Sequence, residues 1–404
     1  MAESRKVVFI VLDGLGDRPC EKLEWQTPLE AAFTPNLNHL AKEGICGMCS
    51  PLEFAVAPES GPAHFEIFGY SPFEKFYPGR GIIEALGTGI KLKENDIAFR
   101  VNFATLKKGK IVDRRAGRIK NVKPFEKDLS MELRGIKFIL KAGTEHRAAL
   151  ILRGANLSHK LSDSDPRKIN KPPKEVRALD KEAEFTAEIL NEYLEKACKI
   201  LSKHRINKIR RKKNLPEANC ILLRGAGKFK KVESFKKRYG LRACCIAGAG
   251  LYKGFGKFIG MNLINVKGAT GGKDTSIKAK FIAAKRALRK YDFVWVHIKG
   301  TDLYGHDGDC IGKKKFIEKI DEALGILMDV KALKVVTGDH STPCSLKEHS
   351  GDDVPILFHG VGVRRDKVSS FGERECANGG LQRIRGKDII QEILNLIGKQ
   401  IIIE

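Results

Sequence analysis

The sequence predicts an α/β protein with a parallel sheet at its centre and a second, smaller α/β unit inserted into the chain. Three short apolar runs, Val7–Leu12, Phe293–Ile298 and residues 334–337, are typical of strands that are buried on both faces of a sheet. Residues 313–330, between the last two runs, have the spacing of an amphipathic helix. A strand, a helix and a strand in this order indicate parallel strands with helices on the faces of the sheet.

A helix is predicted near the start of the chain, at residues 34–44. Thr34 is the expected N-cap, and the proline that follows it suits the first turn. Three apolar residues then fall on one face, and Gly44 is the expected end of the helix.

The middle of the chain has a different pattern. Residues 97–111 alternate between apolar and polar and predict short strands around a turn, and residues 182–202 predict a long amphipathic helix. Two further strands are predicted at residues 220–223 and Ala243–Ile246. This second pattern indicates a unit with a sheet and helices of its own.

We therefore expect two domains. Residues 1–93 and 241–404 form the first, which holds the parallel sheet. Residues 94–240 form the inserted α/β domain. A chain of 404 residues is long enough for two hydrophobic cores.

The composition argues against a membrane-spanning, secreted or disulfide-bonded protein. No apolar run approaches the roughly 20 residues of a membrane helix, and the N-terminus lacks the pattern of a signal peptide. The ten cysteines are scattered, so we expect small, reduced side chains rather than disulfides or a zinc site. These features indicate a cytoplasmic protein that does not bind membranes.

The net charge of +25 favours an anionic ligand. The most basic stretches are residues 203–213 and 228–238, but aromatic residues make up only 7% of the chain and no nucleic-acid docking motif is present. We interpret the lysines as a solvated surface and do not expect nucleic acid as a partner.

Each of the three predicted buried strands is followed by a carboxylate, namely Asp13, Asp302 or Asp339. One aspartate after a strand is a common turn residue. Ligand sites in open parallel sheets collect at the carboxyl ends of the strands, so three such aspartates indicate a shared site.

Histidines accompany two of these aspartates. His306 follows Asp302 by four residues, which places both side chains on one face of a helical turn. His340 is adjacent to Asp339, and His349 follows nine residues later. Carboxylate and imidazole ligands suit Mn²⁺ or Zn²⁺. The pattern predicts a metal site without naming the reaction.

Ser60 is the candidate nucleophile, in the segment PESGPAH at residues 58–64. A serine hydroxyl is a weak nucleophile near neutral pH unless a base or a metal activates it. Taken alone, a serine between Pro and Gly residues is more typical of a turn.

Two sets of motifs resemble those of a known enzyme family, the archaeal cofactor-independent phosphoglycerate mutases of the alkaline phosphatase superfamily. The first set carries the metal pattern: VFIVLDGLGDRP (8–19), PESGPAH (58–64), FGYSP (68–72), GRGIIEALG (79–87), HIKGTDLYGHDGD (297–309) and TGDHSTPCSLKEHSGDDV (337–354). The second set is more specific to the mutases: RVNFAT (100–105), DRRAGRI (113–119), RAALILRG (147–154), residues 189–227 and residues 371–388.

The resemblance implies an alkaline-phosphatase-like domain with two divalent metal ions, and an inserted domain that closes over the substrate. Mn²⁺ is the expected metal, with Zn²⁺, Co²⁺ and Mg²⁺ as alternatives. One metal would be bound by Asp13, Ser60, Asp339 and His340, and the other by Asp302, His306 and His349.

The resemblance also implies the reaction. Ser60 would take the phosphoryl group of 3-phosphoglycerate, and the bound glycerate would recover it as 2-phosphoglycerate, without 2,3-bisphosphoglycerate. Arginine side chains suit bidentate contacts to phosphate and carboxylate. The expected substrate-binding residues of the insert are Arg100, Asp113, Arg114, Arg115, Arg118, Arg147 and Arg224.

The segment around the nucleophile departs from the family pattern. The family usually has Asp directly after the serine, and here Glu59 precedes Ser60 and Gly61 follows it. The alternative is therefore another phosphotransferase or phosphatase of the superfamily that acts on a different small phosphomonoester.

Overall fold

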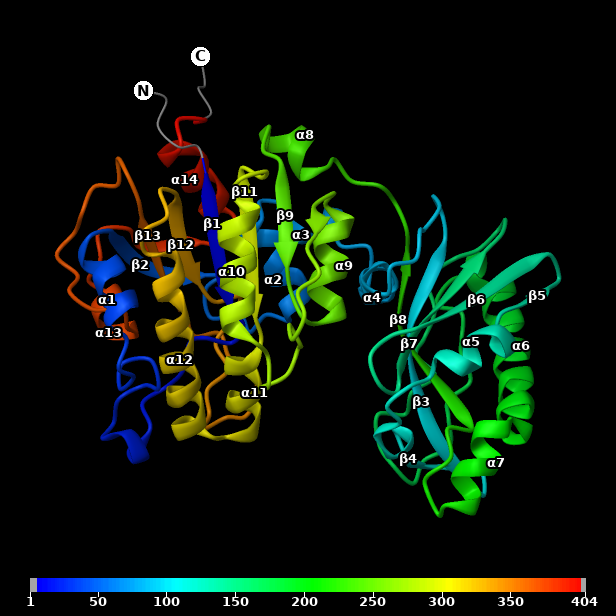
Figure 1. Ribbon diagram of the computed structural model, residues 1–404. Coiled ribbons are helices and arrows are strands. Elements are labelled where there is room, and N and C mark those ends of the chain that lie inside the picture. Colours follow the sequence, from blue (N-terminus) through cyan, green and yellow to red (C-terminus); the bar gives the residue numbers. More distant parts are fainter. Residues whose placement is uncertain (1–5, 401–404) are drawn as a thin grey trace. The chain divides into compact units, whose positions relative to one another are not determined.

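The computed structural model describes residues 6–400 and contains two compact units (Figure 1). Unit 1 comprises Met1–Tyr77 and Glu233–Glu404, and unit 2 comprises Pro78–Val232. No helix within the described residues is long and apolar enough to cross a membrane. All ten cysteines are free thiols.

Unit 1 is built on one eight-stranded sheet. All neighbouring strands are parallel except at β13, which runs antiparallel to both of its neighbours. The predicted parallel core is thus confirmed, with one reversed strand. In spatial order the strands are β10 (Asn262–Leu263), β9 (Ala243–Ile246), β11 (Phe293–Ile298), β1 (Val7–Leu12), β12 (Leu333–Thr337), β13 (Val354–His359), β2 (Ile45–Ser50) and β14 (Gln382–Arg385).

The three strands predicted from apolar runs lie next to one another. β1 is central, with β11 and β12 as its parallel neighbours, and every residue of these three strands is buried. The register pairs Leu12 with Ile298, and the amide of Asp13 donates to the carbonyl of Ile298 at 2.9 Å. The carboxyl ends of the three strands therefore lie at one edge of the sheet.

Helices cover both faces of this sheet (Figure 1). On one face, Val8, Ile10 and Leu12 of β1 share a core with apolar residues of α1, α10 and α12. On the other face, Phe9 packs against Phe68 beside α2, with ring centroids 5.3 Å apart. The helices of unit 1 are α1 (Pro35–Lys42), α2 (Ser60–Ile67), α3 (Phe73–Phe76), α8 (Phe235–Tyr239), α9 (Gly250–Phe258), α10 (Ile277–Ala287), α11 (Gly300–Asp307), α12 (Cys310–Leu324), α13 (Glu373–Cys376) and α14 (Asp388–Leu396), with 3₁₀ turns η1 (Glu21–Leu23) and η5 (Gly325–Leu327).

Helix α1 begins where the sequence places it, but its side-chain cap is different. Thr34 occupies the N-cap position, and its side chain makes no capping hydrogen bond. The carboxylate of Asp321, on α12, accepts from the amides of Asn36 at 3.2 Å and Leu37 at 2.7 Å. Thr34 is therefore the N-cap residue, as predicted, but a charged acceptor from a distant segment, and not the Thr34 side chain, satisfies these amides.

Unit 2 is built on a sheet in which the paired strands are antiparallel. The order is β4 (Lys110–Asp113), β3 (Ile97–Lys107), β7 (Arg147–Arg153), β6 (Ile136–Ala142) and β5 (Met131–Leu133), and β8 (Cys220–Lys228) also pairs with β3. The helices are α4 (Arg80–Gly87), α5 (Glu126–Leu129), α6 (Glu184–Lys203) and α7 (Arg205–Lys212), with 3₁₀ turns η2 (Ala116–Arg118), η3 (Lys123–Phe125) and η4 (Lys181–Ala183).

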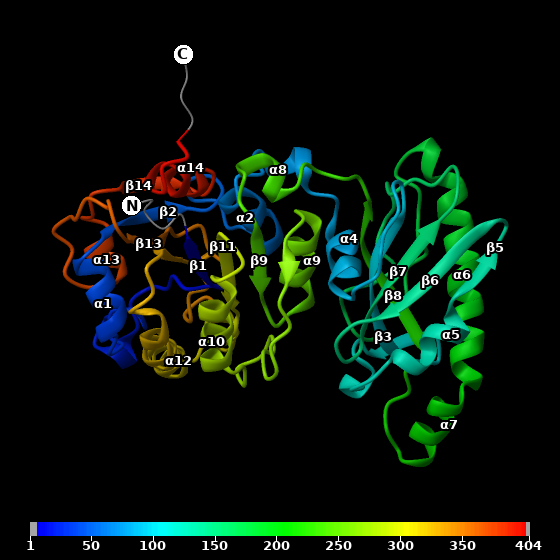
Figure 2. The ribbon, with the colours of Figure 1, turned by 45° about the horizontal axis from the view of Figure 1, so that its top comes forward.

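The long helix predicted for this region is α6, which packs against one face of the sheet of unit 2 (Figure 2). Phe138 of β6 stacks on Tyr193 of α6 with ring centroids 4.5 Å apart. Unit 2 starts at Pro78, whereas the sequence placed the start of the insert at Glu94. The additional element is α4, which packs closely on β3, since a Cβ atom at Gly81 would lie 2.1 Å from the carbonyl oxygen of Ala98.

Candidate metal centre

Four segments of unit 1 bring the predicted site residues to the carboxyl edge of the sheet. Asp13 directly follows β1, and α11, which carries Asp302 and His306, begins two residues after β11. Asp339 and His340 follow β12. Ser60 is the first residue of α2. Parallel strands that end side by side explain why residues far apart in sequence converge.

The first predicted set surrounds the Nε2 atom of His340. This nitrogen lies 3.1 Å from Ser60 Oγ, 3.4 Å from Asp13 Oδ1 and 3.5 Å from Asp339 Oδ2. All four side chains are buried. The structure therefore brings Asp13, Ser60, Asp339 and His340 together in one cluster.

The second predicted set surrounds the Oδ1 atom of Asp302. His306 Nε2 lies 3.2 Å from this oxygen and His349 Nε2 lies 3.5 Å from it. The ring of His349 also stacks on that of His340, with centroids 3.7 Å apart. The two clusters are thus adjacent, and His340 lies next to both.

Hydrogen bonds on the far side of the rings assign the histidine tautomers. Nδ1 of His306 faces the carbonyl of Lys347 at 2.8 Å, and Nδ1 of His349 faces the carbonyl of Pro58 at 2.8 Å. Because a carbonyl only accepts, each Nδ1 carries a proton, and each Nε2 is the nitrogen that faces the Asp302 carboxylate.

The tautomer of His340 follows from one hydroxyl group. Thr342 Oγ1 donates its single proton to Asp302 Oδ1 at 3.0 Å, so it accepts from His340 Nδ1, also at 3.0 Å. Nε2 of His340 is then the nitrogen that faces Ser60, Asp13 and Asp339. Burial alone would lower the pKa of this ring, but Asp339 and Asp13 raise it above its ordinary value. This is the arrangement of a metal-binding imidazole held in place from behind.

The residues fit divalent cations. Asp13 Oδ1 and Asp339 Oδ2 are buried oxygens with no hydrogen-bond partner among the described residues. Leaving a buried carboxylate oxygen without a donor is costly unless a cation binds it. Three carboxylates, three imidazole nitrogens and a hydroxyl are ligands that Mn²⁺ and Zn²⁺ accept. Two groups of residues lie close enough to hold an ion here: Asp13, Asp339 and His340, and Asp302, His340 and His349.

The carboxyl groups of the centre differ in their electrostatics. Burial, together with the nearby Asp13, raises the pKa of Asp339 to about 7. Burial would raise the pKa of Asp302 too, but hydrogen bonds from His306 and His349 hold it well below its ordinary value. The Asp302 carboxylate in turn raises the pKa of His306 to about 9. Burial would raise the pKa of Asp13 as well, but Lys299 holds it well below its ordinary value. Asp13 and Asp302 therefore each carry a negative charge in the metal-free protein.

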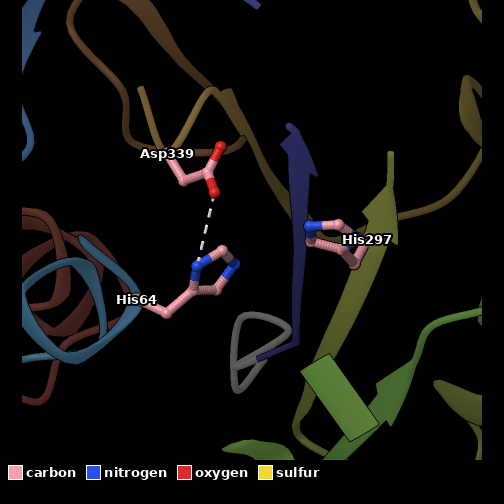
Figure 3. Close-up of side chains that lie close together, drawn as sticks. All are labelled: His64, His297 and Asp339. Atoms are coloured by element: carbon pink, nitrogen blue, oxygen red, sulfur yellow. Dashed lines mark ion pairs between the residues drawn. The ribbon is translucent and has the colours of Figure 1, made fainter. Parts of the chain in front are cut away.

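Two buried histidines that the sequence reasoning did not assign lie behind the first cluster (Figure 3). Nδ1 of His64, one helical turn after Ser60, lies 2.6 Å from the carbonyl of Ser60 and 3.5 Å from Asp339 Oδ2. Nε2 of His297, in β11, lies 3.2 Å from Asp13 Oδ2. His64, His297 and Asp339 also lie close enough to hold an ion. Because the carbonyl of Ser60 accepts from His64 Nδ1, that nitrogen serves to hold the nucleophile's helix.

Lys299 and Tyr252 are further neighbours that were missed. Both contact the Asp13 carboxylate, and Lys299 also contacts Asp302. Lys299 lies within the motif HIKGTD, which was its only sequence signal, and Tyr252 lies outside every motif considered. Lys299 follows β11 and Tyr252 lies on α9, and contacts from such separate segments leave no periodic pattern in the sequence.

Three of the predicted arginines in unit 2 share one face of its sheet. Arg100 of β3 pairs with Arg224 of β8, and Asn102 of β3 pairs with Arg147 of β7. Residues that are directly paired, or two apart in a strand, project from the same face. Burial, together with the nearby Arg147 and Arg224, lowers the pKa of Arg100 to about 10. Such crowding of like charge is typical of an anion-binding surface.

The remaining predicted residues of unit 2 lie in or next to one turn, and two of them, Asp113 and Arg114, have protein partners. Arg114 makes two hydrogen bonds to Asp165, at 2.6 and 3.1 Å. The carboxylate of Asp113 accepts from the amides of Arg115 and Gly117, both at 2.7 Å, and so fixes the turn. Arg115 and Arg118 themselves are exposed.

The departure at Gly61 has a local structural basis. A Cβ atom at this position would lie 3.2 Å from Cε2 and 3.3 Å from the hydroxyl oxygen of Tyr77. Tyr77 also packs edge-on against Phe65 of the same helix, with ring centroids 5.5 Å apart. Glycine therefore lets an aromatic ring sit beside the first turn of α2, where the family usually has a carboxylate.

Comparison with known proteins agrees with this geometry. The model of the Metalloenzyme superfamily matches residues 5–396. The chain is 45% identical over 394 residues to a 2,3-bisphosphoglycerate-independent phosphoglycerate mutase of Picrophilus torridus, covering 97% of this chain and 98% of the relative. It is 46% identical over 404 residues to phosphoglycerate mutase 1 of the same type from Methanocaldococcus jannaschii, covering 98% of each.

Solved structures show the same similarity. A Pyrococcus horikoshii protein superposes with a TM-score of 0.87 at 38% identity, covering 100% of both chains. A cofactor-independent phosphoglycerate mutase of Thermoplasma acidophilum superposes with a TM-score of 0.73 at 38% identity, covering 97% of this chain and 100% of the other.

Proposed function

The chain belongs to the Metalloenzyme superfamily and, within it, to the 2,3-bisphosphoglycerate-independent phosphoglycerate mutases, and on this premise we propose how its residues carry the reaction. The activity is the interconversion of 3-phosphoglycerate and 2-phosphoglycerate, an isomerisation in glycolysis and gluconeogenesis. The observation that carries the proposal is the position of Ser60 Oγ, 3.1 Å from Nε2 of His340 and among the converging carboxylates.

Two divalent ions, with Mn²⁺ as the preferred metal, complete the centre. Asp13, Ser60, Asp339 and His340 would hold one ion, and Asp302, His306 and His349 the other. When bound, the metals lower the pKa of the serine hydroxyl and offset negative charge on the phosphoryl oxygens. The unpartnered oxygens of Asp13 and Asp339 support this assignment.

Ser60 carries the phosphoryl group between the two hydroxyls of glycerate. Its Oγ attacks phosphorus, the bond from phosphorus to O3 of the substrate breaks, and O3 takes the proton that Ser60 loses. The glycerate then turns, O2 attacks the phosphoserine, and the proton of O2 returns to Ser60 Oγ. The position of Ser60 at the start of α2 supports this role, because free amides at a helix N-terminus favour a phosphate group.

Unit 2 provides the arginines that bind the anionic substrate, and it encloses the glycerate during its turn. Enclosure is needed because glycerate that escapes from the phosphoenzyme leaves a phosphoserine for water to hydrolyse. Arg100, Arg147 and Arg224, which share a sheet face, are the central candidates. Asp113 and Arg114 hold the adjoining turn, and Arg115 and Arg118 are the exposed residues of that turn.

The cytoplasm is the proposed compartment, because the glycolytic intermediates that this enzyme uses are found there. The basic surface is proposed to be solvated and not to bind nucleic acid, since no docking module accompanies it.

We predict that Ser60→Ala abolishes both mutase turnover and phosphoenzyme formation. Wild-type enzyme should convert 3-phosphoglycerate to 2-phosphoglycerate in an enolase-coupled assay, and quenched enzyme should yield a phosphopeptide at Ser60. Ser50→Ala is a suitable control, because Ser50 is buried in the same unit and its hydroxyl bonds to Asp353. Steady phosphate release without isomerisation would identify a phosphatase instead. A phosphopeptide at another residue would refute the assignment of Ser60.

The role of unit 2 is tested by Arg147→Gln. Loss of one cationic partner should raise KM for 3-phosphoglycerate roughly tenfold or more, since a charged hydrogen bond contributes about 1.5–3 kcal/mol. Arg134→Gln is the matched control, because Arg134 lies in the same unit and pairs with Glu188 and Glu192 on its surface. Equal KM values for the two variants would remove Arg147 from the substrate site.

A further inference from the structure

The ammonium group of Lys299 joins carboxylates that end two different strands. Its Nζ lies 3.1 Å from Asp13 Oδ2 and 2.7 Å from Asp302 Oδ2. The third neighbour is the hydroxyl of Tyr252, at 3.2 Å. An ammonium group has three protons, so these three acceptors satisfy it completely.

The hydrogen bonds around Asp13 leave one of its oxygens for a cation. Oδ2 receives the hydroxyl proton of Tyr252 and a proton of Lys299, and it also faces His297. Oδ1 has no hydrogen-bond partner among the described residues and faces Nε2 of His340. The donors are thus gathered on the oxygen that points away from the cluster.

Asp302 is divided in a similar way, but its inner oxygen also accepts a hydrogen bond. Its Oδ2 is the atom that Lys299 contacts, whereas Oδ1 accepts from Thr342 Oγ1 and faces Nε2 of His306 and Nε2 of His349. Lys299 therefore holds the outer oxygen of one carboxylate from each proposed metal site. The inner oxygens remain directed at the histidines.

We propose that Lys299 is a positioning residue that ties Asp13 to Asp302, so that the two metal sites form as one unit. The proposal rests on the two-metal centre proposed above. A carboxylate whose second oxygen is occupied presents a single oxygen to a cation, and a shared clamp fixes both inner oxygens relative to each other. Tyr252 completes the clamp, because it accepts from Lys299 and donates to Asp13.

Charge and positioning predict opposite effects of removing Lys299. A cation next to a metal site repels the metal, so loss of the ammonium group would strengthen metal binding if charge alone mattered. If the clamp matters more, its loss weakens metal binding, because both carboxylates become free to rotate. The sign of the change in affinity therefore distinguishes the two roles.

The experiment is a titration of chelator-treated enzyme with Mn²⁺, followed by calorimetry and by electron paramagnetic resonance of the spin-coupled Mn²⁺ pair. Wild-type enzyme should bind two ions and show the coupled signal. Lys299→Met, which keeps the length of the side chain, should bind Mn²⁺ at least tenfold more weakly and lose most of the coupled signal. Lys299→Arg should restore part of both, and Tyr252→Phe should fall between wild type and Lys299→Met.

A matched control is Lys285→Met, which removes an ammonium group that pairs with Asp329 on the surface of the same unit. It should leave binding and the spin-coupled signal unchanged. Binding as tight as or tighter than wild type in Lys299→Met, with the coupled signal intact, would overturn the clamp. If Lys299→Met does not fold, wild-type binding and signal in Tyr252→Phe would overturn it. A wild-type enzyme that binds fewer than two ions would instead refute the metal centre on which the proposal rests.

Discussion

Single residues of the centre show how hydrogen bonds behind a ligand decide what it can do. One proton on Thr342 Oγ1 fixes the tautomer of His340, and backbone carbonyls do the same for His306 and His349. His64 and His297 differ, because His64 bonds to the carbonyl of Ser60 and His297 faces Asp13 Oδ2, the oxygen that also receives the Tyr252 and Lys299 protons. The five histidines therefore have two separate tasks, presenting a nitrogen to a cation and supporting the groups that do so.

The buried histidines predict an acid-sensitive metal-free protein. Burial lowers the pKa of His297 to about 4 and that of His64 to about 3, whereas an unfolded histidine titrates near about 6.5. As the pH falls below that value, the unfolded chain takes up protons that the folded chain refuses, so the free energy of unfolding decreases. Carboxyl groups with raised pKa values, such as Asp339 and Glu373, act in the opposite direction.

The effect of His297 is therefore measured by comparing how the free energy of unfolding changes with pH in wild type and in His297→Gln. When the pH falls from 7 to 5, the free energy of unfolding of the chelator-treated wild type, measured with urea, should lose about 2 kcal/mol because of His297. His297→Gln should lack that contribution, since glutamine does not titrate. An equal change with pH in wild type and variant would show that His297 is not held neutral in the folded protein.

Two regular features of the strands and helices determine where the metal centre lies, namely parallel strand pairing and helical periodicity. Strands β1, β11 and β12 are adjacent and parallel, so the residues that follow them lie at one edge of the sheet. Helix α11 then places Asp302 and His306 one turn apart on the same face. Both features can be read from the sequence. They explain why a site can be predicted from residues that are almost 330 positions apart.

Helix α1 provides a prediction at the level of elements. Asp321→Ala removes the acceptor of two backbone amides and of the Asn36 side chain, and should lower the free energy of unfolding by about 2 kcal/mol. Thr34→Val should cost clearly less, because the Thr34 side chain makes no capping bond. Urea unfolding at neutral pH measures both changes. Equal losses, or a larger loss for Thr34→Val, would restore Thr34 as the cap.

The residues proposed to bind metal and those proposed to bind substrate lie in different units, and each unit has its own sheet and core. Every proposed metal ligand lies in unit 1, and every proposed substrate arginine lies in unit 2. Each unit also has its own hydrophobic cluster, one around β1 and the other between β3 and α6. The net charge of +25 is therefore distributed over two bodies with different tasks.

This division predicts how metal removal acts on the protein. Chelation should abolish mutase activity, with Mn²⁺ restoring it best, and should lower the unfolding temperature of unit 1 while leaving that of unit 2 unchanged. A ligand that binds only the folded state stabilises the unit to which it binds. Differential scanning calorimetry with and without Mn²⁺ measures both transitions. Full activity in strong chelator would contradict the metal mechanism, and a metal-dependent shift confined to unit 2 would place the ions elsewhere.

The sequence by itself determined the parallel core and the convergence of the carboxylates, because apolar runs and residue spacing are local patterns with direct structural consequences. It indicated the extents of β1 and β11, the helical spacing of Asp302 and His306, and the family to which the chain belongs. The strand pairing that followed from these patterns was confirmed.

Only the tertiary structure decided what supports these features. The reversal of β13, the capping of α1 by Asp321 and the contacts of Lys299, Tyr252 and His297 with Asp13 depend on which segments meet in space. The partners of these contacts are separated by about 240 to 290 residues in the case of Asp13. No local pattern encodes such pairs, because a single hydrogen bond between distant segments leaves no periodicity in either of them.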